Sequence, residues 1–137
     1  MKSITLKGRK VVAGKAKGEA VVTNEPISFV GGVNPNTGFV TEPGHQLEGT
    51  NLAGKVLVYP TGKGSTGGSY RIYDMAVHHT GPIAFVQIQA EPIATIGAIM
   101  GNLPVVDALD KNPTEVIATG DIVEVDADKG LVIVTKK

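Results

Sequence analysis

The sequence predicts a mixed α/β fold in which parallel and antiparallel strands occur together, with residues 1–137 forming a single domain. In the middle of the chain, strand patterns alternate with helical patterns, and such units produce parallel strands through right-handed crossovers. In the C-terminal segment 121–137, valines occupy alternate positions on both sides of Asp126–Gly130, a pattern that is typical of an antiparallel hairpin. These observations favour a sheet of mixed direction with helices packed against it.

The first part of the chain has the pattern of short strands. β-branched residues alternate between glycines in "RKVVAG", "GEAVVT", "ISFV" and "TGFVT", and segments of this kind are typical of strands bounded by turns. We therefore expect strands at 9–14, 18–23, 27–30 and 37–41.

The middle of the chain alternates strands and helices. Near-continuous apolar runs are typical of strands buried on both faces, and they occur at 54–60, 81–88 and 103–107. The predicted helices have apolar residues at i, i+3, i+4 and i+7, or a proline in the first turn and a glycine near the end. They span 68–79 and 91–102, and a helical turn follows at 112–120.

Composition excludes several classes of function. The 13 basic and 13 acidic side chains balance, and aromatic residues make up only 4%, so nothing favours a nucleic-acid partner. The chain has no cysteine, so it has no disulfide and no iron–sulfur site built on its own thiolates. No apolar run is long enough to span a bilayer and no signal peptide is evident, so we expect no membrane partner and a cytoplasmic protein.

The glycine-rich segment "TGKGSTGGSY" (61–70) is the main candidate for function. Gly62 to Gly67 match the G-x-G-x-x-G pattern that binds a dinucleotide pyrophosphate. Pro60 and Thr61 separate the pattern from the preceding strand, however, and the chain before it is rich in strands, so the dinucleotide interpretation is weak.

Two other interpretations fit the same segment. Ser65 or Thr66 could cap the helix that follows, which is the interpretation that the residues alone favour. Alternatively, backbone N–H groups at the start of that helix, together with Lys63, would stabilise the alkoxide of a serine and allow it to act as a base.

Four segments resemble the small, swivel-type subunit of the aconitase X family. They are "GRKVVAGKAKGEAVVTNEPISFVGGVNPNTG", "LAGKVLVYPTGKGSTGGSY", "EPIATIGAIMGNLPVVD" and "TGDIVEVDADKG", and they cover most of the chain from Gly8 to Gly130. The resemblance implies a swivelling β/β/α domain, like the mobile fourth domain of aconitase. It also implies a heterodimer with a larger aconitase X-type catalytic subunit that carries a [4Fe-4S] cluster, while this chain holds no metal or cofactor.

The resemblance implies a hydro-lyase that is active only with its large subunit. Archaeal two-subunit members dehydrate (R)-5-phosphomevalonate to trans-anhydromevalonate 5-phosphate in the mevalonate pathway, and bacterial relatives dehydrate cis-3-hydroxyproline. The length of this chain favours the archaeal reaction and hence a small phosphorylated hydroxy-acid substrate. A non-catalytic swivel module that binds a small molecule or a nucleotide is the alternative left open.

The family motif assigns roles to particular residues. The serine of the K-G-S-[ST] loop is the proton acceptor of the family, and here it is Ser65. The residues expected to line the substrate site are Lys63, Gly64, Thr66, Ser28, Gly31, Gly32 and Glu91. Glu91 is included because it ends a strand next to the glycine-rich segment if both crossovers are right-handed, so that the two turns lie at the same end of the sheet.

The remaining polar residues have simpler interpretations. His78 and His79 point about 100° apart on a helix, so we expect a solvated helix end there instead of a metal site. His45 lies in a polar loop and is expected at the surface. Arg9 and Lys10, in a basic cluster near the N-terminus, are candidates for contacting a phosphate or an acidic partner.

Overall fold

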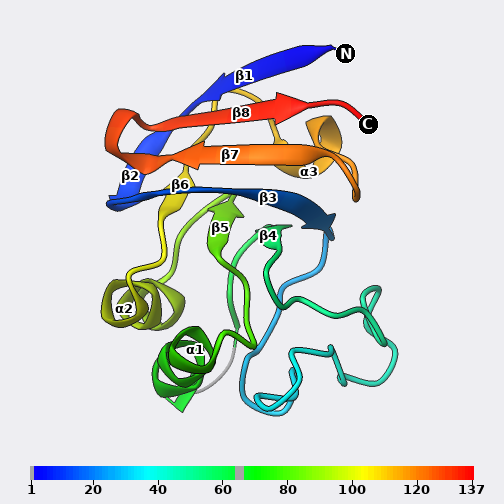
Figure 1. Ribbon diagram of the computed structural model, residues 1–137. Helices are drawn as coiled ribbons and strands as arrows, with labels where there is room; N and C mark the ends of the chain where they lie inside the picture. Colours follow the sequence, from blue (N-terminus) through cyan, green and yellow to red (C-terminus); the bar gives the residue numbers. More distant parts are fainter. Residues whose placement is uncertain (1, 64–66) are drawn as a thin grey trace.

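The fold consists of two strand layers and one helix layer (Figure 1). The computed structural model describes residues 2–63 and 67–137. All strands belong to one eight-stranded sheet in the order β1-β8-β7-β3-β4-β5-β6-β2. The strands are β1 (Ser3–Lys7), β2 (Arg9–Val12), β3 (Lys15–Val22), β4 (Val56–Tyr59), β5 (Ala84–Gln87), β6 (Val105–Asp107), β7 (Ile122–Asp126) and β8 (Leu131–Thr135). The helices are α1 (Gly67–His78), α2 (Pro92–Gly101), the single turn α3 (Pro113–Val116) and the 3-10 turn η1 (Ala127–Lys129).

Strand direction divides the sheet into two halves. Strands β3, β4, β5 and β6 run parallel to one another. The pairs β1–β8, β8–β7 and β7–β3 are antiparallel, and so is the pair β6–β2 at the other edge. In Figure 1 the antiparallel strands β1, β8, β7 and β3 lie above β4 and β5, and α1 and α2 lie below them. This arrangement confirms the predicted mixed α/β class and its β/β/α layering.

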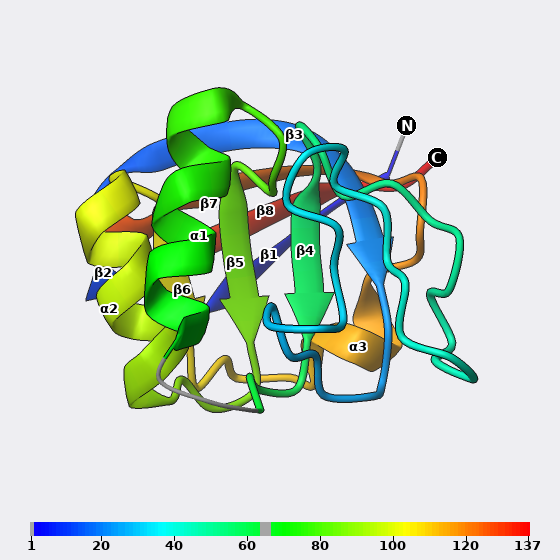
Figure 2. The ribbon, with the colours of Figure 1, turned by 90° about the horizontal axis from the view of Figure 1, so that it is seen from below.

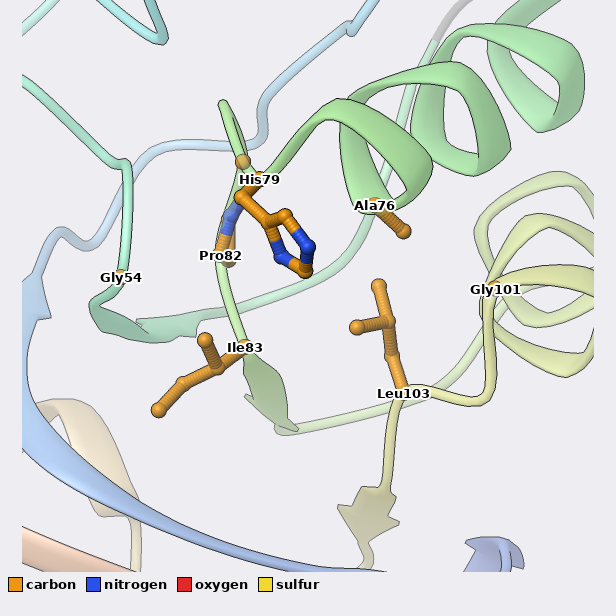
Figure 3. Close-up of a pocket in the computed structure, with 8 residues that line it drawn as sticks. Gly54, Ala76, His79, Pro82, Ile83, Gly101 and Leu103 are labelled. Atoms are coloured by element: carbon orange, nitrogen blue, oxygen red, sulfur yellow. The ribbon is translucent and has the colours of Figure 1, made fainter.

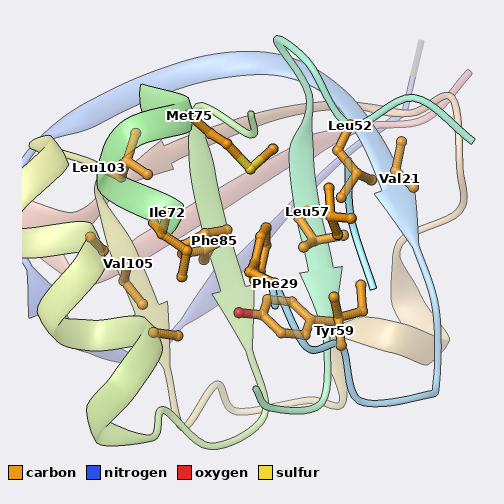
Figure 4. Close-up of a cluster of buried hydrophobic side chains, with 14 of the residues drawn as sticks. Val21, Phe29, Leu52, Leu57, Tyr59, Ile72, Met75, Phe85, Leu103 and Val105 are labelled. Atoms are coloured by element: carbon orange, nitrogen blue, oxygen red, sulfur yellow. The ribbon is translucent and has the colours of Figure 1, made fainter. Parts of the chain in front are cut away.

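Each pair of layers encloses its own apolar core. One core lies between the two halves of the sheet and gathers valines such as Val56 and Val86 from the parallel half and Val123 and Val132 from the antiparallel half. The other lies between the parallel half, the helices and the long loop 23–55 (Figures 2 and 4). Because both faces of β4 and β5 contact a core, all of their residues are buried, as the apolar runs predicted.

The two long helices pack through small residues. A Cβ added to Gly97 of α2 would lie 2.8 Å from the Ser69 carbonyl oxygen of α1, and one added to Gly101 would lie 2.8 Å from the Cβ of Ala76. These glycines are therefore needed for the close approach of the helices. The Ser69 hydroxyl donates a 2.7 Å hydrogen bond to the Ile93 carbonyl, which joins the first turns of α1 and α2.

Several predictions for the first part of the chain were wrong. The expected strands at 27–30 and 37–41 are absent from the described residues, where only isolated bridges occur, at Ile27, Val33, Phe39 and Val40. Gly31 and Gly38 adopt positive φ angles of 81° and 88°, so turns interrupt these segments before a ladder can extend. Strand β1 was missed because its pattern is short and mostly exposed.

The expected surface position of His45 was also wrong. Its side chain is buried, Nε2 lies 3.0 Å from the Pro26 carbonyl oxygen, and Nδ1 accepts a 2.9 Å hydrogen bond from the Leu47 N–H. The ring therefore holds together two parts of the loop 23–55. His78, in contrast, is exposed at the last position of α1, as predicted.

Candidate functional site

The candidate site lies where β4 and β5 end, at one end of the parallel half of the sheet. The segment after β4 reaches Gly62, and the turn after β5 reaches Glu91. A Cβ added to Gly62 would overlap the Oε1 atom of Glu91, so these two turns are in contact. The prediction that they lie at the same end is confirmed for Gly62 and Glu91.

The contact also explains the first glycine of the G-x-G-x-x-G pattern. Gly62 leaves room for the carboxylate of this chain's own Glu91. A carboxylate at this position would repel a pyrophosphate group. The dinucleotide interpretation therefore gains no support from the described residues.

The segment 26–33 runs beside the glycine-rich segment. Ile27 forms a parallel bridge with Gly62, and the Lys63 N–H donates a 3.0 Å hydrogen bond to the Ile27 carbonyl. Gly32 has no room for a side chain, because a Cβ there would overlap the Ser28 carbonyl oxygen. Gly31 differs, since a Cβ at that position would meet no atom within 4 Å.

Lys63 has an acidic partner that the sequence analysis missed. Its ammonium group lies 3.1 Å from Oε2 of Glu42. The N–H groups of Thr41 and Glu42 both donate to the Gly32 carbonyl, at 2.9 and 3.3 Å. Glu42 thus links Lys63 to the Gly31–Gly32 turn. The two partners lie 21 positions apart, on either side of β4, and no periodic pattern indicates the pairing.

Glu91 caps helix α2. Its carboxylate accepts hydrogen bonds from the N–H groups of Ile93 (2.8 Å) and Ala94 (2.7 Å), and its backbone is extended. A carboxylate at this position satisfies two N–H groups that otherwise have no partner within the helix, and it interacts favourably with the helix dipole. One oxygen of this cap, Oε1, is the atom that Gly62 accommodates.

An ion pair holds the turn after β5 from its other side. Arg9 of β2 donates from Nε and Nη2 to the two carboxylate oxygens of Asp107 at 2.9 and 2.8 Å, and the Ala90 N–H donates to Asp107 Oδ2 at 2.8 Å. Burial favours protonation of Asp107, but the hydrogen bonds from Arg9 and Ala90 and the charge of Arg9 outweigh it and hold the pKa of this carboxyl below its usual range. The Arg9 side chain is 66% exposed, so Arg9 remains a candidate for contacting an anion.

A buried polar pair lies directly beneath the site. Gln87, at the end of β5, donates from Nε2 to the Tyr59 hydroxyl at 3.0 Å, and both side chains are fully buried. Burial raises the pKa of Tyr59 far above its usual range, and the nearby charge of Glu91 raises it further. The Tyr59 hydroxyl therefore stays neutral, and together with Gln87 it fills the interior beneath the candidate site.

The structure brings some of the expected site residues together and leaves others untested. Ser28, Gly31, Gly32, Lys63 and Glu91 all belong to the adjoining turns at this end of the sheet. The expected base Ser65, with Gly64 and Thr66, lies outside the described residues. Within residues 2–63 and 67–137, no group of three His, Asp or Glu side chains is arranged to bind a metal ion, and no helix is long and apolar enough to cross a membrane.

Comparisons with known proteins agree with this architecture. The family model described as the aconitase X swivel domain matches residues 5–134. A "phosphomevalonate dehydratase small subunit" from Methanocella arvoryzae is 48% identical over 127 residues, which are 93% of this chain and 96% of the relative.

Solved structures of related proteins share this fold. A chain of the crystal structure of Thermococcus kodakaraensis aconitase X in its holo form superposes with a TM-score of 0.91 at 46% identity, covering 97% of this chain and 99% of that one. The 3-isopropylmalate dehydratase structure from Methanocaldococcus jannaschii has a TM-score of 0.62 at 19% identity, over 90% of this chain and 82% of that one, and this likeness concerns the fold alone.

Proposed function

Because this chain belongs to the aconitase X swivel-domain family, we propose that it is the small subunit of a two-subunit hydro-lyase that converts (R)-5-phosphomevalonate to trans-anhydromevalonate 5-phosphate and water. The observation that carries this proposal is the 48% identity, over 93% of the chain, with a relative named phosphomevalonate dehydratase small subunit. The names of such relatives favour neither the cis-3-hydroxyproline reaction nor a non-catalytic swivel module.

The partner in this proposal is an aconitase X-type large subunit. This chain has no cysteine, and its described residues form no metal-binding group, so it does not fit as the protein that holds an iron–sulfur cluster. A [4Fe-4S] cluster bound by the large subunit would supply a Lewis acid for the departing hydroxyl group. The enzyme would then be active only as the assembled heterodimer, which we expect in the cytoplasm.

The role of this chain is to move a proton. In a dehydration, one carbon loses a proton and its neighbour loses a hydroxyl group, which leaves a carbon–carbon double bond and water. We assign the proton to Ser65, two positions before α1 in the sequence, which would accept it as an alkoxide. The Lys63 ammonium, two residues earlier, would favour this alkoxide through its positive charge.

The neighbouring turns would hold the substrate. Gly31 leaves backbone accessible at the rim, and Ser28 and Gly32 belong to the same turn, beside Lys63. In the proposal they line the substrate site with Gly64, Thr66 and Glu91. Since Glu91 already caps α2, its contribution would come mainly from positioning the turn after β5.

Reconstitution tests the proposal. The chain and the aconitase X-type large subunit of the same organism would be purified separately without oxygen, then mixed and supplied with (R)-5-phosphomevalonate. We expect trans-anhydromevalonate 5-phosphate in NMR spectra of the mixture and none from either subunit alone. Turnover of cis-3-hydroxyproline but not of phosphomevalonate would contradict the assigned substrate, and turnover by this chain alone would contradict the two-subunit enzyme.

A further inference from the structure

The outer side of the α1–α2 layer is apolar. We call it the helix-layer face, and its exposed residues are Tyr70, Tyr73 and Val77 of α1 and Ile96, Ile99 and Met100 of α2. Val77 and Ile99 are 53% and 56% exposed, values at which a surface helix normally carries polar side chains. Helix α2 contains no charged residue at all.

Helix spacing makes this surface continuous. Ala76 and Gly101 are in contact at the junction of α1 and α2, and Val77 and Met100 are their immediate neighbours in sequence. Residues four positions apart share one side of a helix. Tyr73 therefore lies on the same side of α1 as Val77, one turn nearer its start, and Ile96 lies in the same way beside Met100 on α2. These apolar residues thus lie on two helices that run side by side (Figure 2).

An ion pair of α1, Asp74 with His78, lies on the other side of this helix. Asp74 and His78 face one another across one helical turn, with a carboxylate oxygen 3.3 Å from Nδ1 of the imidazole ring, and they point away from the side that contacts α2. The outer face of the antiparallel strands is different, since Lys15 and Glu124 form an ion pair there at 3.4 Å. This chain therefore keeps one face charged while it leaves the helix-layer face uncharged.

A hollow extends the helix-layer face at the end opposite the candidate site (Figure 3). Its volume is about 410 Å³, and its walls include Ala76, Pro82, Ile83, Gly101 and Leu103, together with the imidazole ring of His79. The hollow opens next to Val77 and Met100, because Ala76 and Gly101 belong to its wall. A concave, largely apolar socket beside an apolar strip is the kind of surface in which an anchoring side chain of a protein partner is buried.

At its other end, the helix-layer face begins beside the candidate site. Tyr70 is 71% exposed and lies in the first turn of α1. The preceding residue, Ser69, donates a hydrogen bond to the Ile93 carbonyl in the first turn of α2, directly after Glu91. Two further exposed apolar residues belong to turns of the candidate site: Val30 precedes Gly31, and Ile88 directly follows β5. A protein that completes this site from outside therefore meets the first turns of both helices, and a continuous apolar surface leads away from that contact.

We propose that the helix-layer face is a docking surface for the large subunit, an inference that rests on the two-subunit function proposed above. The partner reaches the candidate site to supply the groups that this chain lacks, and its contact continues along α1 and α2 toward the hollow. The partner surface is itself apolar and weakly charged, because charged groups buried against these residues would have no counter-charge. A second copy of this chain is the competing occupant, and the experiment distinguishes the two.

The test measures affinity for the purified large subunit by titration calorimetry. We expect Val77→Glu and Ile99→Glu each to raise Kd at least about tenfold, since each places a charge in an apolar contact. Ile122→Glu is the matched control: Ile122 is 38% exposed on β7, in the opposite layer, so its substitution is expected to change Kd less than about twofold. Circular dichroism would verify folding, and Ile99→Ser replaces any variant that fails to fold.

Activity separates this surface from the chemistry of the site. At saturating concentrations of large subunit, Val77→Glu is expected to recover the wild-type kcat, because it weakens assembly alone. Unchanged Kd in both glutamate variants would overturn the proposal. Dimerisation of the wild-type chain in analytical ultracentrifugation, abolished by these variants while their Kd for the large subunit stays unchanged, would assign the face to a second copy. Since Kd is measured without turnover, a wrong substrate assignment would leave this test valid.

Discussion

Gly62 and Glu91 are in contact across the ends of two parallel strands, so closely that a Cβ on Gly62 would overlap a carboxylate oxygen of Glu91. The same carboxylate caps α2 through Ile93 and Ala94. One contact thus fixes the distance between the glycine-rich segment and the turn after β5. The position of the candidate site depends on this contact.

Gly62→Ala is expected to destabilise the fold. The added methyl group must displace the Glu91 carboxylate from the start of α2, and overpacking of this kind costs roughly 1–3 kcal/mol. Glu91→Ala alone is expected to cost about 1 kcal/mol through the lost cap. In the double variant the methyl group meets no carboxylate, so the combined loss is expected to be smaller than the sum. Chemical denaturation measures all three, and strictly additive losses would contradict the contact.

The Arg9–Asp107 pair predicts a pH dependence of stability. Because the pKa of Asp107 is lower in the folded state, its contribution to stability is complete above the unfolded pKa of about 4, and it is lost as pH falls through the folded value. Arg9→Met is expected to raise the folded pKa and therefore to move acid unfolding to higher pH, by up to about one unit. Denaturation midpoints between pH 2 and pH 7 measure this shift.

Lys17→Met is the control for the Arg9 substitution. It also removes one positive charge from a strand, but Lys17 makes no ion pair with the described residues. A similar shift in both variants would show that net charge, and not the pairing of Arg9 with Asp107, controls acid unfolding.

The sequence predicted the parallel half of the sheet and the proximity of the glycine-rich segment to the turn after β5, because both depend on local patterns. The apolar runs at β4 and β5 and the helices after them place Gly62 and Glu91 together through the rules of strand crossover. Chain contacts that lack such a pattern were not predictable. Arg9 and Asp107 are 98 positions apart, and Glu42 meets Lys63 from an irregular loop.

The loop 23–55 was the least predictable part of the fold. Its β-branched residues suggested strands, but positive φ angles at Gly31 and Gly38 interrupt pairing, and its apolar residues enter the core individually. The burial of His45 follows from this packing, because the ring bonds to backbone groups at Pro26 and Leu47 within the same loop. Single-residue contacts of this kind leave no periodic signal in a sequence.

Lys63→Ala is expected to lower turnover without a comparable loss of stability. Its ion pair with Glu42 is partly exposed and contributes at most about 1 kcal/mol to folding. Removal of the ammonium would raise the pKa of the neighbouring serine, so the pH at which the rate rises is expected to move upward. Lys63→Arg keeps the charge and is expected to keep the pH profile. An unchanged profile in Lys63→Ala would contradict a role of this charge in activating the serine.

Turnover by the heterodimer containing Ser65→Ala tests the central claim most directly. We expect the rate of (R)-5-phosphomevalonate dehydration to fall by roughly 10²-fold or more, the usual scale for loss of a positioned base, while stability and Kd for the large subunit stay close to wild type. Thr66→Ala and Ser69→Ala are controls in the same segment and are expected to lose much less activity. Wild-type turnover in Ser65→Ala would contradict the assignment of the base, and a loss matched by unfolding would assign Ser65 to capping α1 instead.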